Sequence, residues 1–250
     1  MKITIAHLYP DLLNLYGDRG NIECLQKRCL WRDIEVEIIN LTINDQLTPE
    51  ILEQIDIMFM GGGEDWAQKK LYNDFVENKG TLIKQYIESD GVGLFICGGY
   101  QILGNYYRPY SGKDIKGLGI MDLYTRHYGR DKKRCVGNVV CSITGINYLK
   151  NKTLVGFENH GGRTYLEDTK PLAKIKTGHG NNDTAKNEGV IYKNIIGTYL
   201  HGPILPKNPH LADWLIKTAL EKQTGGEVEI TPLDDELEWQ AHKQALKLDK

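Results

Sequence analysis

The stretch GVGLFICGGYQILG, residues 91–104, places a cysteine between an apolar run and two glycines. Residues 91–96 are typical of a strand buried on both faces of a parallel sheet, and a helix is predicted from Gly98. Cys97 then stands on the turn between strand and helix. Unpaired N–H groups and the partial positive charge of a helix N-terminus favour a thiolate there. The pattern is typical of a nucleophile elbow and indicates a reactive Cys97, against the alternative of a plain buried thiol.

Predicted strands and helices alternate along the first hundred residues, which lead up to this turn. Strands are predicted at 2–8, 34–41, 55–60 and 91–96, and helices at 21–32, 49–54 and 66–89. This order predicts an α/β fold, flavodoxin-like, with an open and mostly parallel sheet and helices on both faces. Short alternating runs after about residue 105 predict extra mixed strands in the second half, before a helix at 209–222. We expect one domain over residues 1–250, with a loosely held charged tail at 225–250.

The composition excludes several classes of function. The net charge of −2 gives no basic field for nucleic acid, and the longest apolar runs are far shorter than the roughly 20 residues of a membrane span. We read no signal peptide and expect a cytoplasmic protein. Five cysteines without a C-x-x-C pair indicate neither a disulfide framework nor a structural zinc site, so no metal site is expected. Packing is predicted for the four cysteines other than Cys97, which are Cys24, Cys29, Cys135 and Cys141.

A thiolate nucleophile needs a proton shuttle, normally a histidine. Of the seven histidines, His160 and His201 follow apolar runs and precede glycines, at positions where strand ends gather in an open sheet. The residues alone do not choose between the two. Glycines also end the strand at 55–60, so the N–H groups of Gly62 and Gly98 are predicted to form an oxyanion hole. The alternative for Gly62 is a flexible loop.

Several motifs together carry a family likeness: CGGYQILG (97–104), GGGED (61–65), GFENHGG (156–162) and TYLHGP (198–203). They resemble a class I glutamine amidotransferase domain of the cobyric acid synthase-like, or CobB/CobQ-like, branch. The runs LYPDLLNLYGDRGNI (8–22) and ENHGGRTYL (158–166) narrow the likeness to the glutaminase subunits of lipid II isoglutaminyl synthases. The resemblance implies hydrolysis of L-glutamine through a thioester on Cys97, with His201 as the general acid and base.

The resemblance also implies a heterodimer with a Mur ligase-like subunit, MurT. That partner would use ATP and the released ammonia to amidate D-glutamate of lipid II to D-isoglutamine, and this chain would need no cofactor of its own. An arginine holds the glutamine in the family, and Arg134 best matches that position, with Arg130 and Arg126 as nearby competitors. From the residues alone, a solvated surface arginine is an equal alternative for Arg134.

One departure from the wider class affects the third catalytic residue. Many class I glutaminases carry a glutamate two residues after the histidine, and this chain has Pro203 there. Either Cys97 and His201 act as a dyad, or another carboxylate takes the role, from the partner or from Glu158.

Three other functions compete with the main interpretation. A cobyric acid synthase-like module would need an ATP-binding domain, and the chain has no phosphate loop motif. A DJ-1-like cysteine hydrolase usually has histidine directly after the cysteine, where this chain has Gly98. A non-catalytic binding subunit would not need to retain Cys97 and His201.

Overall fold

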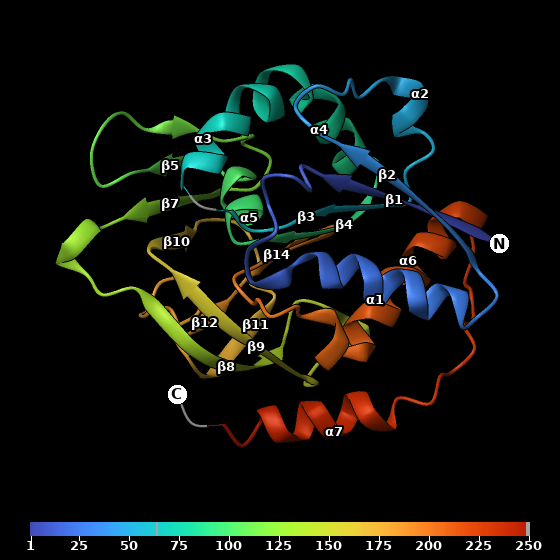
Figure 1. The fold of residues 1–250 in the computed structure, drawn as a ribbon. Helices are drawn as coiled ribbons and strands as arrows, with labels where there is room; N and C mark the ends of the chain where they lie inside the picture. The colour runs from blue at the N-terminus through green and yellow to red at the C-terminus, as the bar shows by residue number, and fades with distance from the viewer. Residues whose placement is uncertain (64, 249–250) are drawn as a thin grey trace.

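The core of the protein is one six-stranded sheet with strand order β13-β14-β4-β3-β1-β2 (Figure 1). The computed structural model describes residues 1–63 and 65–248. The strands of this sheet are β1 (Lys2–Leu8), β2 (Glu35–Leu41), β3 (Ile57–Met60), β4 (Val92–Ile96), β13 (Val190–Tyr192) and β14 (Asn194–Thr198). Every neighbouring pair is parallel except β13 and β14. The open, mostly parallel sheet is therefore confirmed, and the all-apolar β3 and β4 are buried along their whole length.

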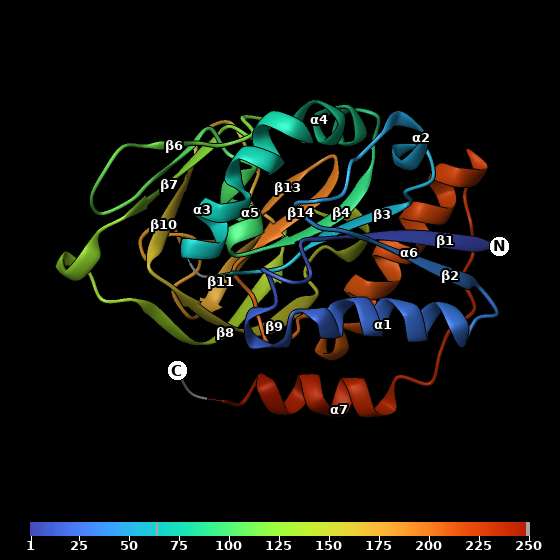
Figure 2. The ribbon, with the colours of Figure 1, turned by 45° about the horizontal axis from the view of Figure 1, so that its top comes forward.

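Helices cover both faces of the sheet (Figures 1 and 2). One face carries α1 (Arg19–Leu30) and α6 (Pro209–Thr224), and the other carries α3 (Asp65–Asn73) and α4 (Gly80–Glu88). Two short helices, α2 (Pro49–Leu52) and α5 (Gly98–Ile102), precede β3 and follow β4. No helix in the described ranges is long and apolar enough to cross a membrane.

The single helix expected at 66–89 is interrupted by a π turn at Asp74–Asn78. The carboxylate of Asp74 is buried there, accepts a hydrogen bond of 2.8 Å from the Tyr9 hydroxyl and forms an ion pair with Lys79. A buried carboxylate requires such partners, and the distorted turn brings Asp74 and Lys79 together. The sequence pattern followed the apolar face of the helix and missed this polar contact.

Two extra sheets form a lobe beyond the carboxyl ends of the core strands (Figures 1 and 2). One has the order β10-β7-β5-β6 and the other β12-β11-β8-β9. Their strands are β5 (Tyr106–Arg108), β6 (Ile115–Lys116), β7 (Leu123–His127), β8 (Cys135–Ile143), β9 (Thr153–His160), β10 (Gly162–Leu166), β11 (Ala173–Thr177) and β12 (Asn187–Glu188). The mixed strands of the second half are thus confirmed. However, β13 and β14 belong to the core sheet rather than to this lobe, because β14 pairs in parallel with β4.

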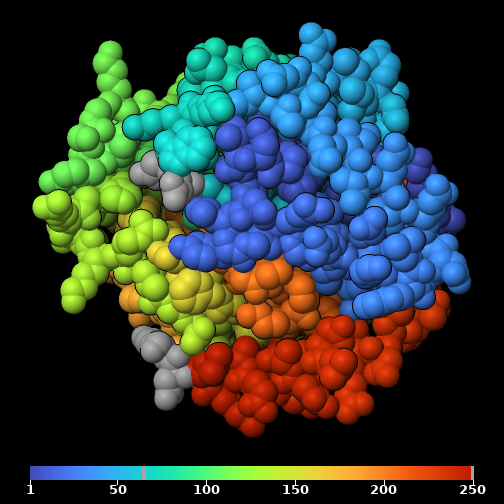
Figure 3. Space-filling model, viewed as in Figure 1, coloured from blue at the N-terminus to red at the C-terminus, as the bar shows by residue number. Residues whose placement is uncertain are grey.

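The C-terminal tail contains a docked helix, α7 (Glu236–Ala245). Asp235 pairs with the buried Arg28 of α1 at 2.6 Å, and His242 is buried with a hydrogen bond of 2.8 Å to Thr153. In Figure 3 the red C-terminal segment lies directly against the rest of the chain. The structure therefore corrects the expectation of a loosely held tail for α7; residues 249–250 lie outside the described part.

Candidate active site

Cys97 occupies a strained turn between β4 and α5. Its backbone has φ of +48° and ψ of −103°, and its N–H donates to the Thr198 carbonyl at 2.8 Å. A positive φ is uncommon for a residue with a side chain and marks functional turns when the surrounding fold maintains it. The bulky Phe95, two residues earlier, finds room against Gly93, where an added Cβ would lie 2.9 Å from its ring. The elbow predicted from the sequence is therefore formed.

His201 is the histidine that reaches Cys97. It follows β14, and its N–H donates to the Phe157 carbonyl of β9 at 2.7 Å, which fixes its backbone. A Cβ added at Gly62 would lie 2.6 Å from Cε1 of His201 and 3.1 Å from Cβ of Cys97, so the three residues meet. His160 lines the same cleft, but its ring stacks on Tyr199 at 3.7 Å and its two nitrogens face the Gly162 carbonyl and Glu158. The structure thus distinguishes the two candidate histidines, His160 and His201, between which the residue pattern could not choose.

Asp18, which the sequence analysis missed, is the carboxylate beside His201. Its side chain is fully buried; Oδ1 lies 3.2 Å from Nδ1 of His201, and Oδ2 accepts the Gly62 N–H at 2.7 Å. Pro203, at the position where the family resemblance leads us to expect a glutamate, faces Gly20, whose added Cβ would lie 2.6 Å from the proline ring. The first turn of α1 therefore approaches the proline closely, and Asp18, the residue just before this helix, provides the carboxylate from another place in the chain.

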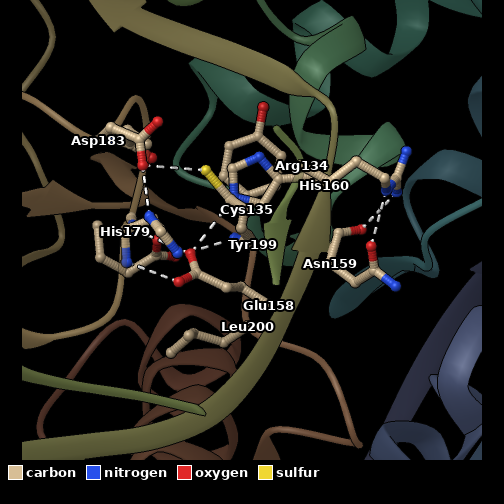
Figure 4. A network of polar contacts seen from close by, with 12 residues as sticks. Arg134, Cys135, Glu158, Asn159, His160, His179, Asp183, Tyr199 and Leu200 are labelled. Atoms are coloured by element: carbon tan, nitrogen blue, oxygen red, sulfur yellow. Dashed lines mark hydrogen bonds and ion pairs between the residues drawn. The ribbon is translucent and has the colours of Figure 1, made fainter. Parts of the chain in front are cut away.

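Glu158 does not take the orienting role considered for it. Its buried carboxylate accepts the backbone N–H groups of His179 at 2.6 Å and Gly180 at 2.9 Å, and one oxygen lies 3.4 Å from Nε2 of His160 (Figure 4). These contacts hold the loop after β11 in the lobe that the two extra sheets form. The motif run at residues 8–22 did contain Asp18, but nothing in its local pattern related that residue to His201.

Electrostatics favour the protonated form of His201. Burial alone would lower the pKa of its imidazole, but the hydrogen bond and charge of Asp18, together with the charge interaction with Cys97, outweigh burial and raise the pKa to about 10. Within the described residues, Nε2 of His201 is buried without a hydrogen-bond partner. The ring is also covered by Tyr16 at a centroid distance of 5.0 Å. His201 is thus a positively charged group held beside the sulfur, with one nitrogen left for a reacting atom.

The two predicted oxyanion donors differ in their surroundings. The Gly62 N–H donates to Asp18 at 2.7 Å in this structure, and its part in an oxyanion hole remains a prediction. The Gly98 N–H belongs to the first turn of α5, where N–H groups lack intrahelical acceptors. Its role remains a prediction.

Arg134 lies at a cleft of about 700 Å³ that Cys97 also lines. Its guanidinium donates to Asn159 twice, from Nε to Oδ1 at 2.9 Å and from Nη2 to the carbonyl at 3.1 Å (Figure 4). Arg130, in contrast, is exposed in a 3-10 turn, and Arg126 is exposed over the ring of Tyr128. Of the three arginines considered, Arg134 is the one that lines the cleft together with Cys97.

A cysteine on a strand–helix elbow, with a histidine and a carboxylate at the carboxyl ends of a parallel sheet, defines the class I glutamine amidotransferase arrangement. The family model of the CobB/CobQ-like glutamine amidotransferase domain matches residues 4–209. The chain belongs to this family, in the group of the GatD subunits, as the following relatives show.

Two curated relatives are each 42% identical to the chain. One, from Staphylococcus aureus (strain N315), matches over 98% of this chain and 95% of its own length. The other, from Streptococcus pneumoniae (strain ATCC BAA-255 / R6), matches over 94% and 86%. Both are named lipid II isoglutaminyl synthase (glutamine-hydrolyzing) subunit GatD. A chain in the structure of PurLQS from Thermotoga maritima is 17% identical, with a TM-score of 0.59 over 99% of this chain and all of that one, and it supports the fold alone.

Proposed function

We propose that the chain hydrolyses L-glutamine to glutamate and ammonia and delivers the ammonia to a Mur ligase-like partner, MurT. The partner would use ATP to amidate D-glutamate of lipid II to D-isoglutamine, and this chain would work in the cytoplasm without its own cofactor. The observation that carries the proposal is the contact of Cys97 with the His201–Asp18 pair beside a cleft. The GatD relatives support the reaction class and the subunit role.

The first half of the reaction follows from the charges at the elbow. The sulfur of Cys97 attacks the side-chain amide carbon of glutamine, and the carbonyl oxygen becomes an oxyanion near the N–H of Gly98. His201 then gives its proton to the amide nitrogen. The carbon–nitrogen bond breaks, ammonia leaves and a γ-glutamyl thioester remains on Cys97. Asp18 keeps the imidazole oriented and favours its protonated form, as the raised pKa indicates.

The second half regenerates the thiolate. After giving up its proton, neutral His201 accepts one from a water molecule, and the resulting hydroxide attacks the thioester carbon. The carbon–sulfur bond breaks, glutamate leaves, and Cys97 and protonated His201 face each other again. One histidine therefore acts first as an acid and then as a base, which requires the fixed ring position that Asp18 maintains.

Substrate selection is assigned to Arg134. Glutamine carries an α-carboxylate, and a guanidinium binds a carboxylate through paired hydrogen bonds that an ammonium cannot reproduce. Asn159 holds the Arg134 side chain at the cleft, since it accepts from both Nε and Nη2. The bound amino acid would then extend from Arg134 toward Cys97 along the same cleft.

The decisive experiment measures glutamate release from glutamine by the purified chain, with and without the co-expressed ligase subunit. Wild-type protein should release glutamate, with a higher rate in the complex if the partner completes the site. Cys97→Ser and His201→Ala should each lose on the order of a thousandfold or more in rate. His160→Ala should retain most of the activity, because both ring nitrogens already have other partners, the Gly162 carbonyl and Glu158. Full activity in Cys97→Ser would refute the mechanism.

Identification of the acceptor needs a second measurement. The complex, supplied with ATP, glutamine and lipid II, should produce amidated lipid II detectable as a mass change of the stem peptide. A cobyric acid synthase-like activity would instead amidate a corrin carboxylate. The two relatives that match over nearly the whole chain favour lipid II.

A further inference from the structure

A second cluster of reactive side chains lies in the lobe, outside the proposed glutaminase machinery (Figure 4). It joins Cys135, the first residue of β8, to His179 and Asp183 of the loop after β11. Their ligand atoms all lie within 4.8 Å of one another. Because 44 residues separate the cysteine from the histidine, spacing along the chain gave no sign of the cluster and no metal site was expected.

The carboxylate of Asp183 divides its two oxygens between different partners. Oδ2 accepts from Nε of Arg163 at 3.0 Å and lies 2.9 Å from its Nη2. Oδ1 faces the sulfur of Cys135 at 3.4 Å and the Nδ1 of His179. Arg163 therefore orients the carboxylate from outside, as outer partners of metal ligands do, and leaves Oδ1 directed into the cluster.

The loop that carries His179 is held in place by the side chain of Glu158. The buried carboxylate of Glu158 accepts hydrogen bonds from the N–H groups of His179 and Gly180. Movement of the loop would remove these bonds and leave a buried charge uncompensated, which is energetically costly. The Cys135 sulfur is buried at the base, whereas the side chains of His179 and Asp183 are 39% and 31% exposed. The cluster is thus rigid on the inside and open to solvent on one side.

We propose that Cys135, His179 and Asp183 form a binding site for a single zinc-type divalent cation. Thiolate, imidazole and carboxylate are the three ligand types that zinc takes in proteins, and a tetrahedral ion holds its ligand atoms about 3–4 Å apart. The separations in the cluster need only small side-chain rotations to reach that range. Solvent on the exposed side supplies the fourth ligand.

The position of the site gives it a structural consequence. Cys135 directly follows Arg134, and its strand pairs with β9 opposite His160. An ion bridging Cys135 to the 179–183 loop would fix the strand end next to the arginine that we place at the glutamine α-carboxylate. The binding itself does not depend on the proposed glutaminase activity.

The test measures zinc binding by the purified wild-type chain in competition with a chromophoric chelator. We expect one ion per chain, and a loss of affinity of about a hundredfold or more in His179→Ala and in Cys135→Ser. Cobalt in place of zinc should give a thiolate-to-cobalt charge-transfer band that disappears in Cys135→Ser. Cys24→Ser, which removes a different free thiol, should leave both signals unchanged.

His179→Ala keeps the test decisive if the buried Cys135 substitution fails to fold, because His179 is partly exposed. Zinc should raise the melting temperature of the wild type and leave that of His179→Ala unchanged. Absence of stoichiometric zinc binding by the wild type would overturn the proposal. Binding that persists in His179→Ala and is lost in Cys97→Ser would also overturn it, since the ion would then occupy the elbow.

Discussion

Replacement of Asp18 by asparagine tests the part of the site that the sequence did not reveal. Asparagine keeps the size of the side chain and an oxygen acceptor for the Gly62 N–H, but it removes the negative charge beside His201. The rise in the His201 pKa from 6.5 to about 10 corresponds to roughly 5 kcal/mol in favour of the imidazolium. If Asp18 supplies half of this, the pKa of His201 falls by about 1.7 units in the variant, so kcat/KM should approach a roughly 50-fold loss above about pH 10 and stay close to the wild-type value near pH 7.

The assay is glutamate release from glutamine across a series of pH values. Below the raised pKa, His201 holds the proton that ammonia needs, so activity should fall as the pH rises through about 10. In Asp18→Asn this alkaline limb should move to lower pH, because the imidazolium is less favoured. A merely structural defect would lower the rate without moving the limb.

Asp11→Asn is the matched control, since Asp11 is an exposed carboxylate in the same segment before α1. It should leave both the rate and the pH profile unchanged. An Asp18→Asn variant that folds normally and keeps wild-type kcat/KM with an unshifted alkaline limb would refute the role of this carboxylate.

Three further predictions concern the substrate anchor, a buried acid and the tail. Arg134→Lys should raise the KM for glutamine while Cys97 still reacts with iodoacetamide, whereas Arg130→Lys should change KM little; the opposite pattern would make Arg130 the anchor. Burial raises the pKa of Glu188 to about 7, so the folded state retains a proton that the unfolded chain releases. The free energy of unfolding should therefore fall as the pH rises from about 4.5 to 7, and Glu188→Gln should remove up to about 3 kcal/mol of that loss, measured by urea unfolding at pH 5 and pH 8. Asp235→Ala should lower the free energy of unfolding by about 2 kcal/mol, because Arg28 then keeps only Asp213 as an acidic partner. The variant should also be cleaved faster by protease in the tail. An unchanged cleavage rate would show that the Arg28–Asp235 pair does not hold α7.

Local patterns predicted the features that depend on neighbours in the chain. The apolar run at 91–96 and the glycines after Cys97 were enough to place a strand, an elbow and a helix, because each follows from residues within one turn. The parallel sheet followed from the alternation of such segments. The same reasoning could not exclude His160, which has the same local setting as His201.

Features that depend on contacts across the chain were missed for a physical reason. Asp18 and His201 are 183 residues apart, and Arg28 and Asp235 are 207 residues apart, so neither pair leaves a periodic signal. The interruption at Asp74 accompanies a buried polar contact with Tyr9, which follows β1. Such pairings become visible only when the strand ends and helices are placed in space.

The left-handed backbone of Cys97 has a cost in stability at the position that carries the reactive thiol. A non-glycine residue held at a φ of +48° costs on the order of 1–3 kcal/mol, and glycine would adopt the same turn without that cost. Loss of the reaction would remove the catalytic advantage of a side chain at position 97 and leave only its packing in the core against the backbone cost, so glycine would become favourable there. Among copies of this domain that have become purely structural, glycine at the elbow is the expected mark of lost function, whereas a retained cysteine is evidence of continuing selection for the thiol.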